Sequence, residues 1–376
     1  MASYSLATLW FERQRYLPGV LAVAFSALLI ALQCGLLLGL FSITSIPIDH
    51  THADVWMGAP KVLSVDLGRP IPESTLARMG VQPEIERCEP YLQGFAFWAK
   101  PGGGNELCMV IGSQLSPDSL GKIDKLTPQQ CGLLAEEGTV IIDESDVKRL
   151  GVKGIGSTAE ISGHAVRVVG TTRGLPSLAG PYVLCSIPTA RKRLPIQQGQ
   201  TTTYVLGRCR NATQAEHVVE RLHQNYSDVS AFTTGEFSRR TQLHWLLKTK
   251  AGIALGYAAA LGLLVGAVVT SQTLYAATVA SLREYAVLRA LGIPRWRMAL
   301  MVVSQSFWIG IIGIALAVPA GYSLAWAADR MMGVHIVSLP WWLQTSAAVV
   351  TLVMALLSGL FALRSLRQIE PATLLR

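Results

Sequence analysis

Long apolar runs without charged residues dominate this sequence, and one of them extends from Ala251 to Leu282. A helix needs about 20 predominantly apolar residues to cross the hydrocarbon core of a bilayer. The run therefore predicts a membrane-spanning helix. Charged residues return directly after it, and Gly292 and Pro294 interrupt the chain before the next apolar run. We therefore expect a short basic segment to join two spans.

Four such runs predict four transmembrane helices. Only 15% of the residues are charged, whereas soluble domains carry about 25%. Because the deficit is concentrated in these runs, we predict a multi-pass α-helical membrane protein with one large polar domain between the first two helices. The predicted spans are residues 17–46, 248–282, 298–328 and 343–363.

The basic residues predict how the chain crosses the membrane. Arg13 and Arg15 precede the first span and Asp49 follows it, so the positive-inside rule places the N-terminus in the cytoplasm. Residues 1–16 are either a helix on the inner membrane surface or an ordinary charged flank. The same rule makes residues 283–297 (the segment between spans two and three) and 364–376 cytoplasmic, and residues 47–247 and 329–342 external.

The polar domain, residues 47–247, combines strand-like and helix-like patterns. Residues 71–80 and 212–226 have helical patterns, and one face of the second stretch carries Ala215, Val218, Val219 and Leu222. Strand-like runs between turns rich in Gly and Pro lie at residues 61–67, 107–113, 138–144, 157–163, 164–172, 181–187 and 201–209. Because strands and helices are mixed without a regular βαβ repeat, this domain is predicted to have an α+β fold.

The net charge of +8 has two interpretations. A basic chain can bind nucleic acid, but this sequence has neither a zinc-ligand spacing nor aromatic residues interleaved with basic ones, so that class is disfavoured. Basic residues beside the spans are the simpler source. The six cysteines have no CxxC pairing; they are small buried hydrophobes, or two of them form one bridge if the polar domain lies outside the cytoplasm.

No catalytic constellation is recognisable in the chain. Asp49, His50, His52 and Asp54 follow the first span, and a His-x-His pair with carboxylates could hold a metal. Solvated residues beside the membrane are the simpler interpretation. The centres of the spans lack ionisable residues, which disfavours a proton or ion path. We therefore predict no metal site, no cofactor site and no catalytic residue.

Four stretches resemble one protein family. They are SLREYAVLRALGIPRWRM at residues 281–298, IEPATLLR at 369–376, HADVWMGAP at 52–60 and the stretch at residues 138–174, which begins GTVIIDESDVKRLG. Together with the order of one span, a large external domain and three further spans, they are similar to the FtsX/MacB-type permeases of ABC transporters. The resemblance covers essentially the whole chain. Within the family, residues 264–292 are most similar to the DevC-like exporter permeases.

The resemblance implies several partners. This chain lacks the G-x-x-x-x-G-K-[ST] loop that cradles nucleotide phosphates, so the ABC ATPase subunit must be a separate chain, and ATP and Mg would bind there. A second copy of the chain or a paralogous permease is also implied. Other members often use a periplasmic adaptor and an outer-membrane channel. The implied location is the bacterial inner membrane, with both termini in the cytoplasm.

The basic segment after span two is the predicted contact with the ATPase. Its apolar ridge with flanking charges fits a helix-in-groove contact, while a plain positive-inside role remains open for its arginines. The predicted coupling residues are Leu282, Arg283, Glu284, Tyr285, Leu288, Arg289, Leu291 and Gly292.

Two glycine pairs lie on span two with the spacing of a close helix contact. They are Gly252 with Gly256 and Gly262 with Gly266. Small residues four apart let two helices approach closely, which favours a homodimer packed through spans one and two. The other interpretation is that glycine is simply frequent in membrane helices.

These observations predict the permease subunit of an ABC exporter of the mechanotransmission type. ATP hydrolysis by the separate ATPase would move the external domain and drive export of a hydrophobic or amphipathic substrate. The alternative is a non-transporting, FtsX-like regulator of an external cell-wall hydrolase. The chain itself is predicted to be non-catalytic in either case.

Overall fold

A computed structural model describes residues 11, 13–194, 200–280, 287, 291, 294–332 and 337–367. The chain forms two compact units. The first, here called the helical unit, comprises residues 1–39, 253–331 and 336–376. The second, here called the inserted domain, comprises residues 40–252 and 332–335. Each unit is described by itself.

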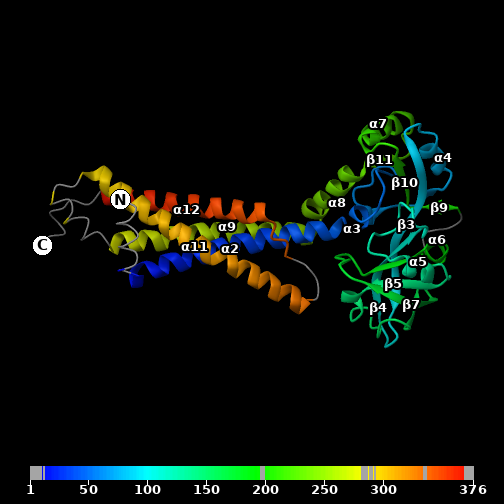
Figure 1. The fold of residues 1–376 in the computed structure, drawn as a ribbon, viewed down its shortest axis with the longest axis horizontal. Helices are drawn as coiled ribbons and strands as arrows, with labels where there is room; N and C mark the ends of the chain where they lie inside the picture. The colour runs from blue at the N-terminus through cyan, green and yellow to red at the C-terminus, as the bar shows by residue number, and fades with distance from the viewer. Residues whose placement is uncertain are drawn as a thin grey trace. The chain divides into compact units, whose positions relative to one another are not determined.

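The helical unit is built from long apolar helices (Figure 1). They are α2 (Arg13–Thr44), α9 (Lys250–Ala280), α11 (Arg295–Met332) and α12 (Trp341–Arg367). Four stretches are long and apolar enough to cross a membrane: Tyr16–Thr44, Lys250–Thr273, Trp296–Met331 and Trp341–Leu360. Each of them overlaps one of the predicted spans. The fold class predicted from the sequence is therefore confirmed for the membrane part.

Small residues bring these helices together. A Cβ atom added at Gly313 of α11 would lie 2.7 Å from Val23 of α2, and one added at Gly310 would lie 2.9 Å from Leu352 of α12. Ile30 of α2 packs with Ala347 of α12 in a small buried cluster. Because lipid tails are as apolar as leucine, helices in a membrane associate through such close packing.

The inserted domain contains a nine-stranded mixed sheet in the order β11-β1-β10-β3-β4-β8-β5-β7-β6. The pairs β4–β8 and β5–β7 are parallel, and the other neighbours are antiparallel. The strands are β1 (Val55–Gly58), β3 (Ile85–Ala99), β4 (Asn105–Ser113), β5 (Thr139–Asp143), β6 (Thr158–Ile161), β7 (His164–Thr172), β8 (Tyr182–Ser186), β10 (Tyr204–Cys209) and β11 (Ser230–Thr233). A second sheet pairs β2 (Ile71–Pro72) with β9 (Thr201–Thr202).

Short helices connect and cover these strands. They are α3 (Ile46–Asp49), α4 (Thr75–Gly80), α5 (Pro128–Leu134), α6 (Ile187–Arg193), α7 (Ala215–Asn225) and α8 (Thr234–Lys248), with 3-10 turns η1 (Val65–Leu67), η2 (Glu144–Asp146) and η3 (Ala212–Gln214). Thr127 and Gln130 form a capping box at the start of α5, which satisfies two free backbone N–H groups. The observed mixture confirms the α+β prediction for this domain.

The domain has two hydrophobic cores, and strands β3, β4, β5 and β8 contribute side chains to both of them. The first core adds α3, β1, α7, β11 and α8, and the second core adds β6, β7 and α6. Tyr91 of β3 belongs to the first core and its neighbour Leu92 belongs to the second. Successive side chains of a strand point to opposite faces of a sheet, so one long strand can serve both cores.

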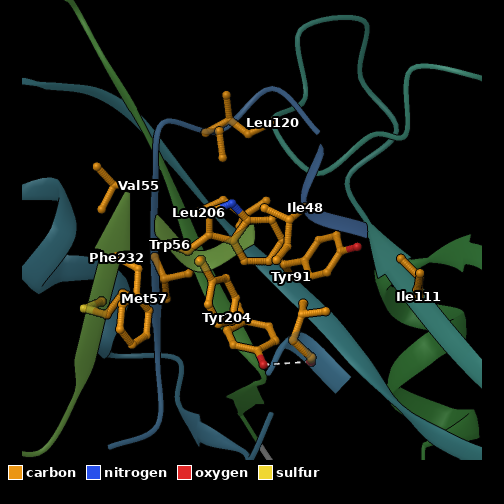
Figure 2. Packing of buried hydrophobic residues seen from close by; sticks show 14 of the residues in the cluster. Ile48, Val55, Trp56, Met57, Tyr91, Ile111, Leu120, Tyr204, Leu206 and Phe232 are labelled. Carbon is orange, nitrogen blue, oxygen red and sulfur yellow. Dashed lines mark hydrogen bonds between the residues drawn. The ribbon is translucent and has the colours of Figure 1, made fainter. Parts of the chain in front are cut away.

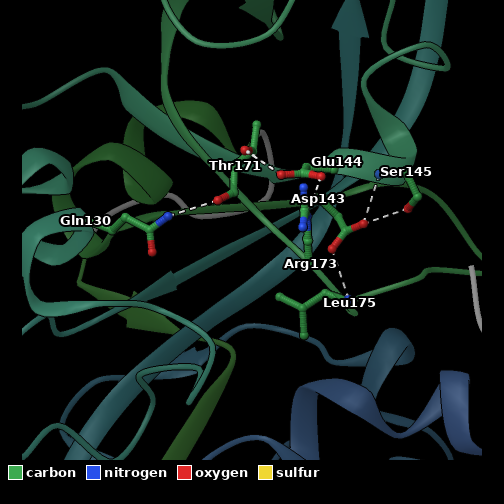
Figure 3. A network of polar contacts seen from close by, with 7 residues as sticks. All are labelled: Gln130, Asp143, Glu144, Ser145, Thr171, Arg173 and Leu175. Carbon is green, nitrogen blue, oxygen red and sulfur yellow. Dashed lines mark hydrogen bonds and ion pairs between the residues drawn. The ribbon is translucent and has the colours of Figure 1, made fainter. Parts of the chain in front are cut away.

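A network of polar contacts joins the end of β5 and η2 to the segment that follows β7 (Figure 3). The Asp143 carboxylate at the end of β5 accepts hydrogen bonds from the Ser145 backbone N–H at 3.0 Å and from the Leu175 N–H at 3.0 Å. Its neighbour Glu144 forms an ion pair with Arg173 at 2.6 Å. These contacts hold η2 against the segment that follows β7, because a buried carboxylate needs several donors to remain stable.

The structure corrects one predicted strand and adds four that were not predicted, β1, β2, β3 and β11. Residues 61–67 were expected to form a strand, but they form a loop that ends in the 3-10 turn η1. Val62 and Val65 are buried, whereas Leu63 and Leu67 are exposed, so burial does not alternate as it does along a strand. The longest strand, β3, was not predicted.

Candidate functional site

The segment that follows span one enters the first core directly. Ile46 and Ile48 of α3 are buried there. The Ser45 hydroxyl donates a hydrogen bond of 2.5 Å to Asp49, which closes this short turn. The end of span one is therefore continuous with the packed interior of the inserted domain.

A loop of the domain, residues 114–126, binds the residues that follow α3. His50 Nδ1 lies 2.9 Å from Asp124 Oδ1, and the backbone N–H of His52 donates to the Leu120 carbonyl at 2.9 Å. The same loop is attached to β3, because the buried Glu89 carboxylate accepts from the Ser119 hydroxyl at 2.7 Å. The loop therefore connects the exit of span one to β3, a strand that contributes to both cores.

The segment that precedes span two is anchored in the same core by aromatic packing. The Phe237 ring of α8 is fully buried and stacks on Phe232 with ring centroids 5.1 Å apart. It also contacts Trp56 and Tyr204 at 5.6 Å. Figure 2 shows Trp56, Tyr91 and Tyr204 together with Ile48 of α3. Such large rings bury much apolar area and fix the position of the helix that carries them.

A polar contact between η1 and α8 adds a second anchor. The Trp245 indole N–H donates to Asp66 Oδ2 at 2.7 Å, and the Val65 N–H donates to the Thr241 hydroxyl at 3.1 Å. The Val65 carbonyl accepts from the Tyr204 hydroxyl at 2.8 Å. Burial raises the pKa of Asp66 from 3.8 to about 6, although the hydrogen bond from Trp245 opposes the rise. The Asp66–Trp245 contact therefore has a titratable member.

The chain bends between α8 and α9. Thr249 is extended there (φ −94°, ψ 146°), and its hydroxyl accepts from the Gly252 N–H at 3.1 Å. A Cβ atom at Gly252 would overlap the carbonyl oxygen of Trp245 and lie 2.7 Å from the Cα atom of Leu246. We call residues 245–252 the elbow. Only glycine fits at position 252 without opening it.

One hydrogen bond joins the two segments that lead to the spans. The Gln242 side-chain amide of α8 donates to the Ser45 hydroxyl at 2.9 Å. With Ile48 and Phe237 in one core, the exit of span one and the entry to span two belong to a single packed body. Packed interiors transmit displacement because they have little free volume. We take this junction as the candidate functional site.

The predicted coupling residues fall almost entirely outside the described part of the chain. This applies to Leu282, Arg283, Glu284, Tyr285, Leu288, Arg289 and Gly292. Leu291 is described: its backbone N–H donates to the Val287 carbonyl at 3.1 Å and its side chain is exposed. Contact of this segment with an ATPase stays a prediction.

The four predicted glycines have three different environments. Gly262 and Gly266 face α2 of the same chain, because added Cβ atoms would lie 3.2 Å from Gln33 and from Ser26 respectively. Ser26 also donates to the Gly266 carbonyl at 3.1 Å. Gly256 faces open space, and Gly252 lies in the elbow. A dimer remains a prediction, and Gly262 and Gly266 already form a contact within one chain.

The residues near the end of span one do not converge on a common point. Asp49 binds Ser45, His50 binds Asp124, and Asp54 accepts from the Cys209 N–H at 2.9 Å. Among the residues that the structure describes, no group of three or more His, Cys, Asp or Glu side chains is arranged to hold a metal ion. The absence of a metal site stays a prediction.

Comparisons with known proteins follow the two units. The family profile of the FtsX-like permease C-terminal domain matches residues 256–371, and that of the MacB-like periplasmic core domain matches residues 20–225. The curated proteins give no match.

Among solved structures, the periplasmic region of MacB from Actinobacillus actinomycetemcomitans is 15% identical, with a TM-score of 0.34 over 51% of this chain and 94% of that chain. The extracellular domain of YknZ, a noncanonic ABC-type transporter from Gram-positive bacteria, is 9% identical, with a TM-score of 0.33 over 48% of this chain and 99% of that chain. The family profiles cover both the spans and the domain inserted between the first two of them. This chain therefore belongs to the FtsX/MacB family of ABC transporter permeases.

Proposed function

We propose that this protein is the membrane subunit of an ABC exporter of the mechanotransmission type. ATP hydrolysis on a separate ATPase moves the inserted domain, and that movement exports a hydrophobic or amphipathic substrate. The chain itself is non-catalytic, and ATP and Mg bind to the partner. The DevC-like subgroup remains a prediction within this proposal.

One observation carries the proposal: the segments that follow span one and precede span two are embedded in the same hydrophobic core. A displacement of α9 along its axis would reach Phe237 through the elbow and α8. Because Phe237 packs against Trp56 and Tyr204, the sheet would have to move with it. Coupling between distant sites needs such a continuous physical connection.

The remaining parts of the proposal follow the family resemblance. The ATPase binds the cytoplasmic segment that includes Glu284 and Leu288, and the protein acts as a pair with a second copy or a paralogous permease. Both termini are cytoplasmic, the inserted domain is external, and the protein resides in the bacterial inner membrane. A periplasmic adaptor and an outer-membrane channel complete the export route.

The experiment is purification of the full chain from its own membranes, with identification of the proteins that accompany it. An ATPase together with an adaptor supports an exporter. An ATPase together with a cell-wall hydrolase contradicts export and indicates a regulator. Absence of any ATPase contradicts the whole proposal.

A matched pair of variants locates the ATPase contact. Charge reversal at Glu284 combined with Leu288→Asp should abolish co-purification of the ATPase, because it removes the apolar ridge and its flanking charge. The control is Gly256→Ala, which changes an open position of α9 and should retain the ATPase. Normal binding by the double variant, with normal insertion, would show that the contact lies elsewhere.

A further inference from the structure

Exposed leucines gather around the Asp66–Trp245 contact. Nine large hydrophobic side chains of the inserted domain are exposed among the described residues, and four of them lie in just two segments, residues 61–69 and 243–250. Leu63 and Leu67 are 45% and 49% exposed, and Leu243 and Leu247 are 44% and 60% exposed. We call these two segments together the collar.

The two segments of the collar are held together and flank one helix. Asp66 lies between the exposed leucines of the loop and binds Trp245 of α8 at 2.7 Å. On an α-helix, residues four apart share a face, whereas residues two apart lie about 200° apart around the axis. Leu243 and Leu247 therefore share a face of α8 that differs from the face of Trp245. The collar presents leucines on two sides of the same helix.

The collar also carries unpaired positive charge. Lys61, Arg69, Lys248 and Lys250 are exposed. No ion-pair partner is found for these four among the residues that the structure describes. The Asp66 carboxylate already accepts from the Trp245 indole, and Arg69 donates to the Pro60 carbonyl. Leucines flanked by Lys and Arg are typical of segments that lie in a lipid headgroup region.

The collar is continuous in sequence with a membrane span, which indicates lipid as its binding partner. Helix α9 begins at Lys250, and Trp245 precedes it by only one helical turn and the extended Thr249. At about 1.5 Å per residue, Leu247 and Trp245 lie within about 10 Å of the start of the span. Tryptophan beside a span is typical of the boundary between membrane and water. A bilayer surface near the start of α9 would therefore be close to both faces of α8 that the collar occupies.

We propose that the collar is a lipid-binding surface, which lies in the headgroup region of the membrane that α9 crosses. Leu63, Leu67, Leu243 and Leu247 contact acyl chains near the interface, and the four cations contact phosphate groups. The loop thereby places the Asp66–Trp245 contact at the membrane surface. This inference does not depend on an ATPase or on the identity of the substrate.

The test uses the full-length protein in lipid nanodiscs. Leu67→Cys and Leu243→Cys variants are each labelled with an environment-sensitive fluorophore, and the discs contain phosphatidylcholine with or without a nitroxide on the headgroup. Ile155→Cys is the matched control, because Ile155 is an exposed apolar residue outside the collar. The unsubstituted protein measures labelling of its own cysteines.

We expect the nitroxide to quench the labels at Leu67 and Leu243 about twofold or more, as for segments buried about 5–10 Å at the interface, and to leave the label at Ile155 unchanged. Equal fluorescence with and without nitroxide at both collar positions would overturn the proposal. So would equal quenching at Ile155, or efficient cross-linking of Leu67→Cys between two copies of the chain, because the collar would then face a second protein molecule.

Discussion

The two cores of the inserted domain differ in which chain segments contribute side chains to them. The first core takes in Ile48 from the exit of span one and Phe237 from the helix that precedes span two. The second core, among the described residues, contains no side chain from either segment. The first core is also rich in aromatic rings, whereas Trp98 is the single aromatic member described in the second.

This difference means that both cores contribute to stability, but that the first core is the one able to transmit displacement from the membrane helices. Both cores stabilise the domain by burying apolar area, and both include part of strand β3. Only the first core connects that strand to the chain segments that continue into the membrane. Removing the same side chain from each core should therefore lower the free energy of unfolding by similar amounts. Only the substitution in the first core should loosen the packing of α8. Four predictions follow this comparison, from the largest expected effect to the smallest.

The largest effect is expected from removing one isoleucine side chain in each core. Ile48 and Ile142 are both fully buried, the first in the first core and the second in the second core. Ile48→Ala and Ile142→Ala should each lower the free energy of unfolding by about 2–5 kcal/mol. Hydrogen exchange of the amides in α8 should accelerate in Ile48→Ala alone. Equal acceleration in both variants would break the distinction between the cores.

A change of pH should affect one carboxyl group beside each core. Burial raises the pKa of Asp146 from 3.8 to about 6, despite nearby Arg149, and burial also raises the pKa of Asp66 to about 6. Because the folded-state pKa values exceed the unfolded ones, the folded state binds more protons between these values. The contribution of each of these two groups to the free energy of unfolding therefore falls as pH rises from about 4 to 6, and it recovers on acidification through the same window. Carboxyl groups whose pKa is lowered by a basic partner act in the opposite direction, so each contribution is measured as the difference between the protein and its Asn variant.

The expected change for Asp146 is at most about 3 kcal/mol between neutral pH and about pH 4. Asp146→Asn should stabilise the protein at neutral pH, since Oδ2 has no hydrogen-bond partner among the described residues. Asp66→Asn should give a smaller gain, because Trp245 already donates to this group. Thermal unfolding at several pH values measures both. The same dependence of stability on pH, between pH 4 and 7, in an Asn variant and in the unsubstituted protein would contradict the assignment for that group.

A smaller effect is expected at the elbow, where two glycines form a matched pair. Gly252→Ala should cost about 1–3 kcal/mol, because the new Cβ would overlap the Trp245 carbonyl. Gly256→Ala faces open space and should be neutral or stabilise the helix by up to about 1 kcal/mol. Thermal unfolding in detergent compares the two. Equal stability of both variants would mean that the backbone of the elbow can shift to make room for a Cβ atom at position 252.

The smallest effect is expected on the exposed surface of the hairpin formed by β3 and β4. Phe97 is 61% exposed, so Phe97→Ser should change the free energy of unfolding by no more than about 0.5 kcal/mol. Growth or export assays of the intact system provide the second readout. Loss of export with unchanged stability would show that this part of the domain takes part in function, and it would sharpen the comparison of the two cores.

The sequence predicted elements whose pattern is local. Strand β7 occupies the expected residues 164–172, because its buried and exposed side chains largely alternate. The buried face of α7 carries the expected Ala215, Val218, Val219 and Leu222. Strand β3 was not predicted because its apolar pattern is interrupted by Glu89, Pro90, Gln93 and Gly94. Glu89 is stabilised there by an ion pair with Arg87 and by hydrogen bonds from Ser119 and Leu120, some thirty residues further along.

The junction could not be predicted for the same reason. Asp66 and Trp245 are 179 positions apart, and nothing in the local sequence of either residue indicates the other. The alternation of Val and Leu in residues 61–67 favoured a strand, whereas the contacts of Val65 with Thr241 and Tyr204 favour a turn. The membrane spans were predictable because charge-free length alone specifies them.

The shared strand β3 also sets the order in which the domain can be completed. All described members of the second core lie between Leu92 and Leu194, whereas the first core needs Phe237. A chain synthesised from its N-terminus can therefore close the second core while α8 is still being made. The helix that precedes α9 would then dock last, onto a strand that is already in place.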